Sequence, residues 1–449
     1  MMGRQLAVSG ATVLTRRRAL CMLEVSVHMM KTTCTLRHLF TACNLLVFIF
    51  LLLLYIRQPR ESTVSHFPNV VNGPFIALAD NKTFIISPYS DPRRSNLIRV
   101  LAIVHKTVQN LYCWFYCKKN GYFRVRANID IVKDRFGFPY ETADLLCESP
   151  PSCDSVYMSI DTNESEDIRE APVFQIPQVP VGSFSAKFSV CISAFYGQYN
   201  NPLQVIQAIE MYKILGASRV TIYNNSCHDN VDKVLRHYIE EGVVDVIPWP
   251  IDTFLRTSKK WKYVEGLDSE IGYYGQTASL NDCIYRNMYT SEFVVLIDID
   301  EIILPVKHLD WSSLMRSLQE RYPGASVFRF ENHAFPSSFK GTGFNPWKHV
   351  PGTTILQHYR EPSDKESIKP RKMIINPRKV FQTSVHSVLK GEGYSVDIPR
   401  QYGFLFHCKQ KRNKKYSDTD LIKDEIIWRY NMSLVPKVDG VIQKLFPRH

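Results

Sequence analysis

The sequence predicts an α/β domain built on a mostly parallel sheet in the second half of the chain. Between residues 186 and 305, short β-branched runs alternate with stretches whose apolar residues recur every three or four positions. This alternation is typical of strand–helix–strand units. The last run, at 293–305, is continuous in Val, Leu and Ile, as expected for a strand that is buried on both faces.

The elements of this domain can be placed one by one. Strands are expected at 188–194, 219–223 and 243–247, ahead of the run at 293–305. One helix is expected after an N-cap at Asn201 with Pro202 in its first turn, and it should end at Gly216. A second is expected after an N-cap at Asn230, ending at Gly242, and a third at 276–288.

Residues 76–185 predict a smaller β-rich domain and a linker ahead of the α/β domain, which is assigned to 186–449. Runs rich in β-branched and aromatic residues are separated by turn residues, and they fall at 97–104, 111–116, 122–132 and 156–160. The pattern favours a sandwich. No site is recognisable in it, so a structural spacer and a carbohydrate-binding domain both stay open.

The N-terminal residues predict a membrane anchor. Residues 39–56 carry no charge, which is about the minimum length for crossing a bilayer. Basic residues precede this run, so residues 1–38 are predicted to be a cytoplasmic tail and 57–75 a lumenal stem. A cleaved signal peptide is the alternative, but the long preceding region and the lack of a small-x-small cleavage site favour a single-pass type II anchor.

Composition indicates a lumenal protein and excludes nucleic acid as the expected partner. The net charge is +12, and half of it lies in the first 57 residues, so the rest of the chain is only mildly basic. Eight cysteines and four N-x-S/T sequons follow the predicted anchor. An even cysteine number without a C-x-x-C pair predicts disulfides rather than a metal site, although the pairing cannot be predicted.

The strand at 293–305 contains three carboxylates, Asp298, Asp300 and Glu301. Alternation along a strand predicts that Asp298 and Asp300 point to one side and Glu301 to the other, where its role would be structural. A divalent ion that also binds a phosphate would compensate the two like charges. An acidic loop or a helix N-cap is the alternative. No glycine-rich phosphate loop follows any strand, which argues against dinucleotide oxidoreductases and P-loop ATPases.

Several stretches together resemble a glycosyltransferase of the GT-A type, and more specifically glycosyltransferase family 92. They lie at 192–197, 222–226, 275–283, 298–302 and 372–386. The resemblance implies transfer of galactose from UDP-galactose to a glycan, with inversion to a β linkage. Acceptors in known members include the core fucose of animal N-glycans and pectic galactan in plants.

The resemblance also implies a metal and nucleotide site. Asp298 and Asp300 would bind Mn²⁺ or Mg²⁺, since oxygen ligands favour these ions over zinc. His386 matches the late histidine that often completes the metal shell, and His407 is its competitor. Gln276, together with Tyr223 and Asn225, would contact the UDP-sugar donor. Asn224 is a sequon at the edge of this site, where a glycan would obstruct the donor.

An inverting reaction also needs a general base for the acceptor hydroxyl. The prediction is Glu331, and the alternatives are Glu361, Asp364 and Glu366. Aromatic side chains could offer stacking faces for sugars, although core packing is the simpler explanation for any one of them. They are Trp249, Trp261, Tyr273 and Tyr274.

The sequence therefore predicts a metal-dependent, inverting galactosyltransferase in the Golgi membrane, with a nucleotide sugar and a glycan or glycoprotein as partners. A non-catalytic lumenal glycan-binding or scaffolding protein with the same fold is the main alternative. A metal-dependent phosphodiesterase fits less well, because no second His/Asp cluster is visible. Galactose is implied by the resemblance alone, and the residues by themselves predict neither the donor sugar nor the linkage nor the oligomeric state.

Overall fold

The structure is a computed structural model that describes most of the chain beyond residue 70. The described residues are 45, 48–49, 70–71, 73–91, 93–117, 121–134, 136–162, 171–179, 182–337, 345–362, 370–410 and 413–448. The chain divides into two units, Met1–Phe67 and Pro68–His449. The predicted tail and, apart from three residues, the predicted anchor at 39–56 lie outside the described residues. Within the described part, no helix is long and apolar enough to cross a membrane.

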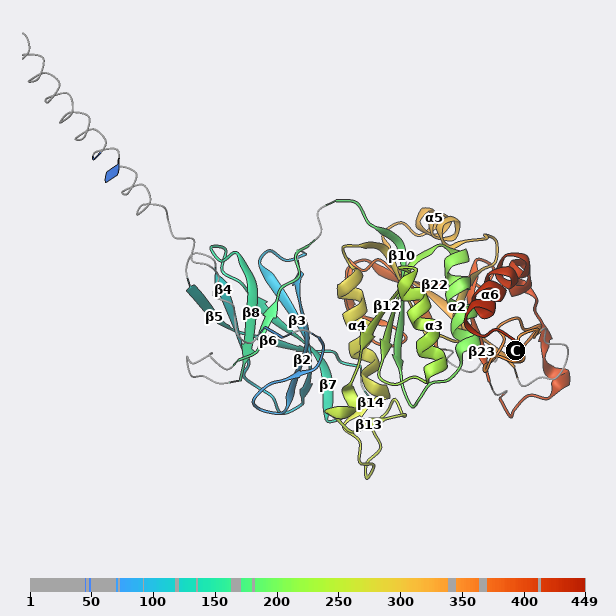
Figure 1. Cartoon of the computed structure of the whole chain (residues 1–449), viewed down its shortest axis with the longest axis horizontal. Helices are drawn as coiled ribbons and strands as arrows, with labels where there is room; N and C mark the ends of the chain where they lie inside the picture. Colours follow the sequence, from blue (N-terminus) through green and yellow to red (C-terminus); the bar gives the residue numbers. More distant parts are fainter. Residues whose placement is uncertain are drawn as a thin grey trace, which may run out of the picture. The chain divides into compact units, whose positions relative to one another are not determined.

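The second unit contains a nine-stranded sheet (Figure 1). Four neighbouring strands are parallel, as predicted: β12 (Val244–Pro248), β11 (Ala217–Asn224), β10 (Ala186–Phe195) and β15 (Ser291–Ile297). The sheet then continues through β19 (Arg371–Ile375), β17 (Ala325–Pro336), β23 (Gly403–Lys409) and β16 (Glu301–Pro305), with β22 (Tyr394–Ile398) beside β17. Its second half is mixed, because β15–β19, β17–β19 and β16–β23 are antiparallel pairs.

Helices cover this sheet. They are α2 (Pro202–Leu215), α3 (Asp229–Glu240), α4 (Gln276–Asn287), α5 (Trp311–Arg321) and α6 (Asn431–Leu445). The predicted caps of α2 are confirmed: the Asn201 side chain accepts from the Gln204 backbone N–H, and Gly216 ends the helix in a left-handed conformation, with φ 106°. The N-cap of α3 is His228, whose ring accepts from the backbone N–H of Asn230. The prediction of Asn230 as the cap was therefore wrong by two residues, because the imidazole takes the capping role.

The segment before β10 forms a two-sheet β-sandwich. One sheet contains β1 (Ile76–Ala77), β2 (Thr83–Asp91), β3 (Leu97–His105), β7 (Tyr140–Glu148) and β6 (Asn128–Ile131), and the other contains β5 (Gly121–Arg126), β4 (Tyr112–Cys117), β8 (Ser155–Asp161) and β9 (Val173–Gln175). The single strand expected at 122–132 is two strands, since β5 pairs with β4 and β6 pairs with β7 in the other sheet. The Cys113–Cys147 disulfide joins the two sheets, and Cys117–Cys153 lies nearby in the sequence.

Short elements complete the structure. Three two-stranded ribbons pair β13 (Thr257–Ser258) with β14 (Ile271–Gly272), β18 (Tyr359–Arg360) with β24 (Ile422–Lys423), and β20 (Val380–Thr383) with β21 (Val388–Gly391). Short 3-10 helices lie at Ile251–Thr253, Tyr273–Gly275, Asp418–Asp420 and Ile426–Tyr430.

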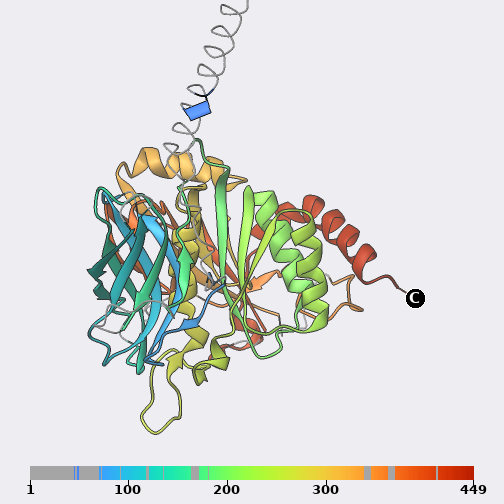
Figure 2. The ribbon, with the colours of Figure 1, turned by 60° about the vertical axis from the view of Figure 1, so that its left-hand side comes forward.

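The sandwich lies beside α4 (Figure 2), and a buried polar seam joins the two. The Tyr285 hydroxyl on α4 lies 3.0 Å from Asp144 Oδ1 on β7, and Arg99 of β3 holds the same carboxylate at 2.6 Å. One turn earlier on α4, Asp282 accepts from the hydroxyl of Tyr89. Because buried polar groups are costly unless they are paired, this seam fixes the position of α4 against the sandwich.

Candidate active site

A cleft of about 380 Å³ opens where β10 and β15 end. It is lined by residues 192–196, 199, 201, 204, 273, 276, 298–300, 407, 408 and 410. This is the edge at which ligands bind in open α/β sheets. The predicted residues Gln276, Asp298 and Asp300 all line the cleft, and so does His407.

The acidic residues do not lie on one continuous strand. β15 ends at Ile297 and β16 begins at Glu301, so residues 298–300 form a turn between them. The argument from strand alternation was therefore wrong. Alternation fails because the strand does not continue through these residues: β16 pairs with β23 and not with β15.

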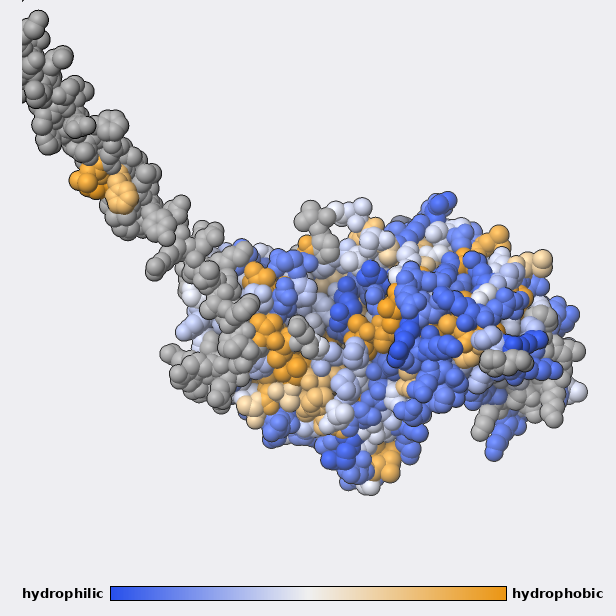
Figure 3. Space-filling view, in the orientation of Figure 1, coloured by the Kyte–Doolittle hydropathy of each residue, from blue (hydrophilic) through white to orange (hydrophobic). Residues whose placement is uncertain are grey.

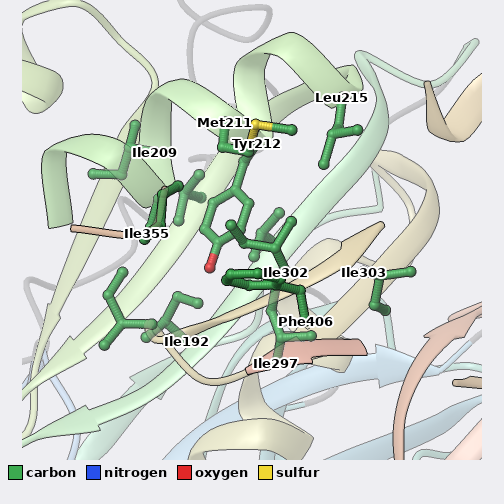
Figure 4. Close-up of a cluster of buried hydrophobic side chains, with 14 of the residues drawn as sticks. Ile192, Ile209, Met211, Tyr212, Leu215, Ile297, Ile302, Ile303, Ile355 and Phe406 are labelled. Atoms are coloured by element: carbon green, nitrogen blue, oxygen red, sulfur yellow. The ribbon is translucent and has the colours of Figure 1, made fainter. Parts of the chain in front are cut away.

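A buried tyrosine of α2 supports this turn from below. The Tyr212 hydroxyl donates to the carbonyl of Glu301 at 2.8 Å and lies 3.4 Å from the carbonyl of Asp298. In Figure 4, the Tyr212 ring stands among Ile192, Ile297 and other apolar side chains, with its hydroxyl directed away from α2. The hydrophobic core thus fixes the backbone that presents the carboxylates.

Asp298 is held by three side chains from three separate elements. Its Oδ2 lies 2.8 Å from Lys372 Nζ, while its Oδ1 accepts from Gln276 Nε2 at 3.2 Å and from Ser193 Oγ at 3.3 Å. Burial alone would raise the pKa of Asp298, but the Lys372 ammonium outweighs burial and holds the pKa below its usual range. Asp298 is therefore an ionised carboxylate with an internal counter-cation.

Glu301 lies beneath the turn and is almost fully buried. Its Oε2 accepts from the Asp298 backbone N–H at 2.9 Å and lies 3.5 Å from Lys372 Nζ. Burial raises the pKa of Glu301, against the opposing charge of Lys372. This placement fits the structural role expected for Glu301.

The structure brings His407, and not His386, next to Asp300. His407 Nε2 lies 3.2 Å from Asp300 Oδ2, and its Nδ1 accepts from the Asn332 side-chain amide at 2.9 Å. His386 is exposed and does not line the cleft; its Nδ1 donates to the carbonyl of Arg371 at 3.1 Å. The charge of His386 acts on Asp298, so it lies in the neighbourhood, but the competitor His407 is the histidine within reach of the second aspartate.

Two residues expected to contact the nucleotide are engaged elsewhere. Tyr223 is fully buried, and its hydroxyl donates to Asp282 at 2.6 Å, so it cannot reach a ligand in the cleft. The Asn225 side chain donates to the carbonyl of Trp249 and to Asp252. Neither residue lines the cleft. Tyr223 lies near the end of β11 and Asn225 follows it, and both contact Trp249.

The predicted general base Glu331 and the alternative Glu361 do not line the described cleft either. Glu331 lies on β17, with Oε1 4.0 Å from His333 Nε2. Glu361 is buried, and its carboxylate accepts from the backbone N–H of Asn413 at 2.7 Å. Asp364 and Glu366 lie outside the described residues. The assignment of a base stays a prediction.

The sequon at Asn224 is packed into the protein. Its side-chain nitrogen lies 3.4 Å from Cys227 Sγ, its side-chain oxygen is buried, and its backbone carbonyl accepts from the N–H of Trp249. Asn224 does not line the cleft. An unmodified Asn224 is therefore the state that this packing accommodates.

Sequence reasoning missed Lys372 and two of the cleft tyrosines, Tyr196 and Tyr199, whereas Tyr273 was named as a stacking candidate. Lys372 is a buried cation inside the apolar strand β19, and a lone lysine in such a run was the available signal. Tyr196 stacks on Tyr274 with ring centroids 4.3 Å apart, and Tyr199 also lines the cleft. The metal site is less developed than predicted: within the described residues, no group of three or more His, Cys, Asp or Glu is arranged to hold an ion.

Comparison with known proteins agrees with this picture. The chain is 22% identical over 380 residues to beta-1,4-galactosyltransferase galt-1 of Caenorhabditis elegans, and the match covers 81% of each chain. It is 28% identical over 183 residues to galactan beta-1,4-galactosyltransferase GALS3 of Arabidopsis thaliana, which covers 40% of this chain and 32% of that protein.

Among solved structures, S. aureus TarS with UDP-GlcNAc matches at 12% identity over 51% of this chain and 60% of that chain, with a TM-score of 0.28, too low to carry an argument. The family model of glycosyltransferase family 92 matches residues 186–444, from β10 to α6. The chain belongs to glycosyltransferase family 92.

Proposed function

We propose that this glycosyltransferase transfers galactose from UDP-galactose to a hydroxyl group of a glycan, with inversion at the sugar carbon, on a GT-A type domain. The observation that carries the proposal is the cleft at the ends of β10 and β15, which Asp298 and Asp300 line. The names of the two galactosyltransferase relatives support galactose as the transferred sugar.

The residues around Asp298 can bind and orient the donor. Lys372 keeps the carboxylate ionised, and Gln276 and Ser193 fix one of its oxygens. An ionised, fixed carboxylate is a strong acceptor for ribose hydroxyl groups, because charge-assisted hydrogen bonds are about twice as strong as neutral ones. Asp298 is thus suited to hold the nucleotide through Oδ2, because Oδ1 already accepts from two side chains and Oδ2 only from Lys372.

Asp300 and His407 fit a divalent ion better than the predicted set of Asp298, Asp300 and His386. Their Oδ2 and Nε2 atoms converge at 3.2 Å on the cleft wall, and oxygen with imidazole nitrogen suits Mn²⁺. His407 Nδ1 lies 2.9 Å from the Asn332 side-chain amide, which orients the ring, and with an ion on Nε2 it would carry the ring proton and donate it to this amide. When bound, such an ion supplies positive charge that offsets the charge developing on the UDP leaving group.

The test is transfer by the purified chain with a panel of UDP-sugars and neutral glycans, with Mn²⁺ or chelator. We expect transfer with UDP-galactose and a loss of at least about 100-fold in Asp300→Asn, the range for removing one charge-stabilising group. Asp245→Asn is the matched control, because Asp245 forms only an exposed ion pair with Arg219. No transfer with any donor, together with glycan binding that persists in chelator, would favour the non-catalytic glycan-binding alternative.

We further propose that the chain works in the Golgi lumen as a type II membrane protein. The predicted anchor, the sequons and the Cys113–Cys147, Cys117–Cys153 and Cys191–Cys283 disulfides support an oxidising compartment. Cys227 and Cys408 are free. Microscopy of the tagged full chain beside a Golgi marker tests the location, and a cytosolic distribution would contradict it.

A further inference from the structure

The loop between β13 and β14 carries exposed apolar side chains next to the donor cleft. Figures 1 and 2 show the loop protruding below these strands, and Figure 3 shows apolar surface at its lower end. Trp261 is 55% exposed, Leu267 44% and Val264 42%. Exposed apolar groups that gather on one loop mark a binding surface more often than isolated ones do.

The Trp261 ring is held in place by the sandwich. It packs edge-to-face on Phe136, with centroids 5.7 Å apart and an interplanar angle of 90°. The next aromatic of the loop, Tyr263, packs edge-on against Phe138 at 5.8 Å, and its backbone N–H donates to the carbonyl of Phe136 at 2.9 Å. The loop is thus fastened to the sandwich at two points, while more than half of the Trp261 surface stays open.

A small hollow lies between Trp261 and the donor cleft. Tyr273 and Gln276 line both the hollow and the cleft, and Asp134 and Glu141 of the sandwich also line the hollow. Asp134 is fixed because its Oδ2 accepts from the Thr277 hydroxyl at 3.1 Å. The hollow holds only about 30 Å³, which is room for a few waters and not for a sugar ring. A sugar ring would therefore rest on its rim, over Trp261, rather than inside it.

The wall between the hollow and the cleft is strained and rigid. Tyr273, Tyr274 and Gly275 have φ angles of 46°, 53° and 70°, three left-handed residues in succession. The two tyrosines are there at an energetic cost, and such strain persists only where the surroundings enforce it, commonly at functional sites. Here Trp249 Nε1 donates to the carbonyl of Tyr274 at 2.9 Å, and Tyr274 stacks on Tyr196 of the cleft.

We propose that Trp261 is the acceptor subsite: its exposed ring stacks on the apolar face of a neutral pyranose, while Asp134 and Glu141 accept hydrogen bonds from that sugar's hydroxyl groups. The inference rests on the proposed function, and it names the acceptor class. A neutral acceptor is favoured because the lysines at 259, 260 and 262 share the segment with Glu265, Asp268 and Glu270.

Kinetics of acceptor binding provide the first test. Trp261→Ala is expected to raise the acceptor KM roughly 10-fold, the size of an aromatic stacking contribution, with kcat and the UDP-galactose KM within 2-fold of wild type. Trp261→Phe keeps an aromatic face and is expected to recover most of the affinity. Phe254→Ala is the control: Phe254 is 38% exposed on the same segment, but it packs on Phe75 and Phe84 away from the hollow.

Tryptophan emission provides a test that does not depend on transfer. Trp261 is the only tryptophan of the six that is mostly exposed; four are buried and Trp428 is half-buried. Titration of the full chain with galactotetraose is expected to give a saturable emission shift, which disappears in Trp261→Phe but persists in Phe254→Ala.

The two proposals fail in distinguishable ways. Transfer with normal acceptor KM in Trp261→Ala, and no emission shift in wild type, would overturn the subsite and leave the galactosyltransferase proposal standing. A saturable shift without transfer from any donor would overturn the transferase proposal and leave a sugar site at Trp261.

Discussion

Lys372→Met tests whether the donor site depends on its internal counter-cation. The ammonium lies 2.8 Å from Asp298 and 3.5 Å from Glu301, and the Lys372 side chain is only 3% exposed. Removing one partner of a buried ion pair costs about 3–5 kcal/mol, because it leaves an unpaired buried charge. The Asp298 side chain is 36% exposed, so water relieves part of this cost, and we expect a loss of about 2–3 kcal/mol.

Urea unfolding and UDP titration in chelator provide the measurements. The UDP affinity is expected to fall about 10-fold, since Asp298 loses its fixed ionised state. The low pKa of Asp298 means that its stabilising contribution is present above about pH 4 and is lost as the pH falls through the folded value. In Lys372→Met, burial is left without this counter-charge and raises the pKa of Asp298, so the dependence should reverse and stability should be gained as the pH falls through the folded value.

Two further variants make the reasoning refutable. Arg378→Met is the matched control: Arg378 donates to the carbonyls of Met288 and Ser291, so its loss should reduce stability and leave UDP affinity unchanged. Lys372→Met combined with Asp298→Asn should be more stable than Lys372→Met alone, since the unpaired charge at Asp298 is removed and only that of Glu301 is left. A single variant within 0.5 kcal/mol of wild type, or a double variant that is no better than the single, would refute the argument.

Three other predictions concern the same framework. Burial lowers the pKa of His407, but Asp300 outweighs burial and raises it. The stabilising contribution of His407 should therefore be present below about pH 6.5 and lost as the pH rises through the folded value. Urea unfolding in chelator should show this loss, and His407→Gln should abolish it. Gly275→Ala should lower the free energy of unfolding by about 1–3 kcal/mol, since residue 275 has φ 70° and the added Cβ would lie 2.6 Å from an isoleucine methyl. Gly242 has φ 71°, but a Cβ there meets open space, so Gly242→Ala should destabilise the protein less when both variants are compared by thermal melting. Replacing both Cys191 and Cys283 by Ala should lower the free energy of unfolding by about 2–5 kcal/mol, because their bond ties β10 to α4 across 92 positions; an unchanged urea midpoint would contradict this.

The parallel half of the sheet could be predicted because local signals agree there. Asn201, Pro202 and Gly216 specify both ends of α2 by themselves, and the apolar runs of β10 and β15 have no alternative to burial. The mixed half could not be predicted. β16 pairs with β23 across about 100 residues, and nothing in either strand specifies its partner.

The site could be predicted only in part for the same reason. Gln276 begins α4, and Asp298 and Asp300 come directly after β15, so the topology brings all three to the same edge of the sheet. Lys372 and His407 reach the cleft from β19 and β23, whose places in the sheet are set by long-range pairing. The choice between His386 and His407 depended on that pairing, and so did the failure of strand alternation around Asp298.

The polar seam at α4 implies that the family-matched segment and the folding unit begin at different residues. The family match begins at residue 186, yet α4 within it buries Asp282 and Tyr285 against Tyr89 and Asp144, which lie ahead of that boundary. A recombinant fragment that starts at 186 would leave these polar groups and the surrounding aromatic face in water. Such a fragment should aggregate or express poorly, so the segment that the family model matches is shorter than the segment needed for folding.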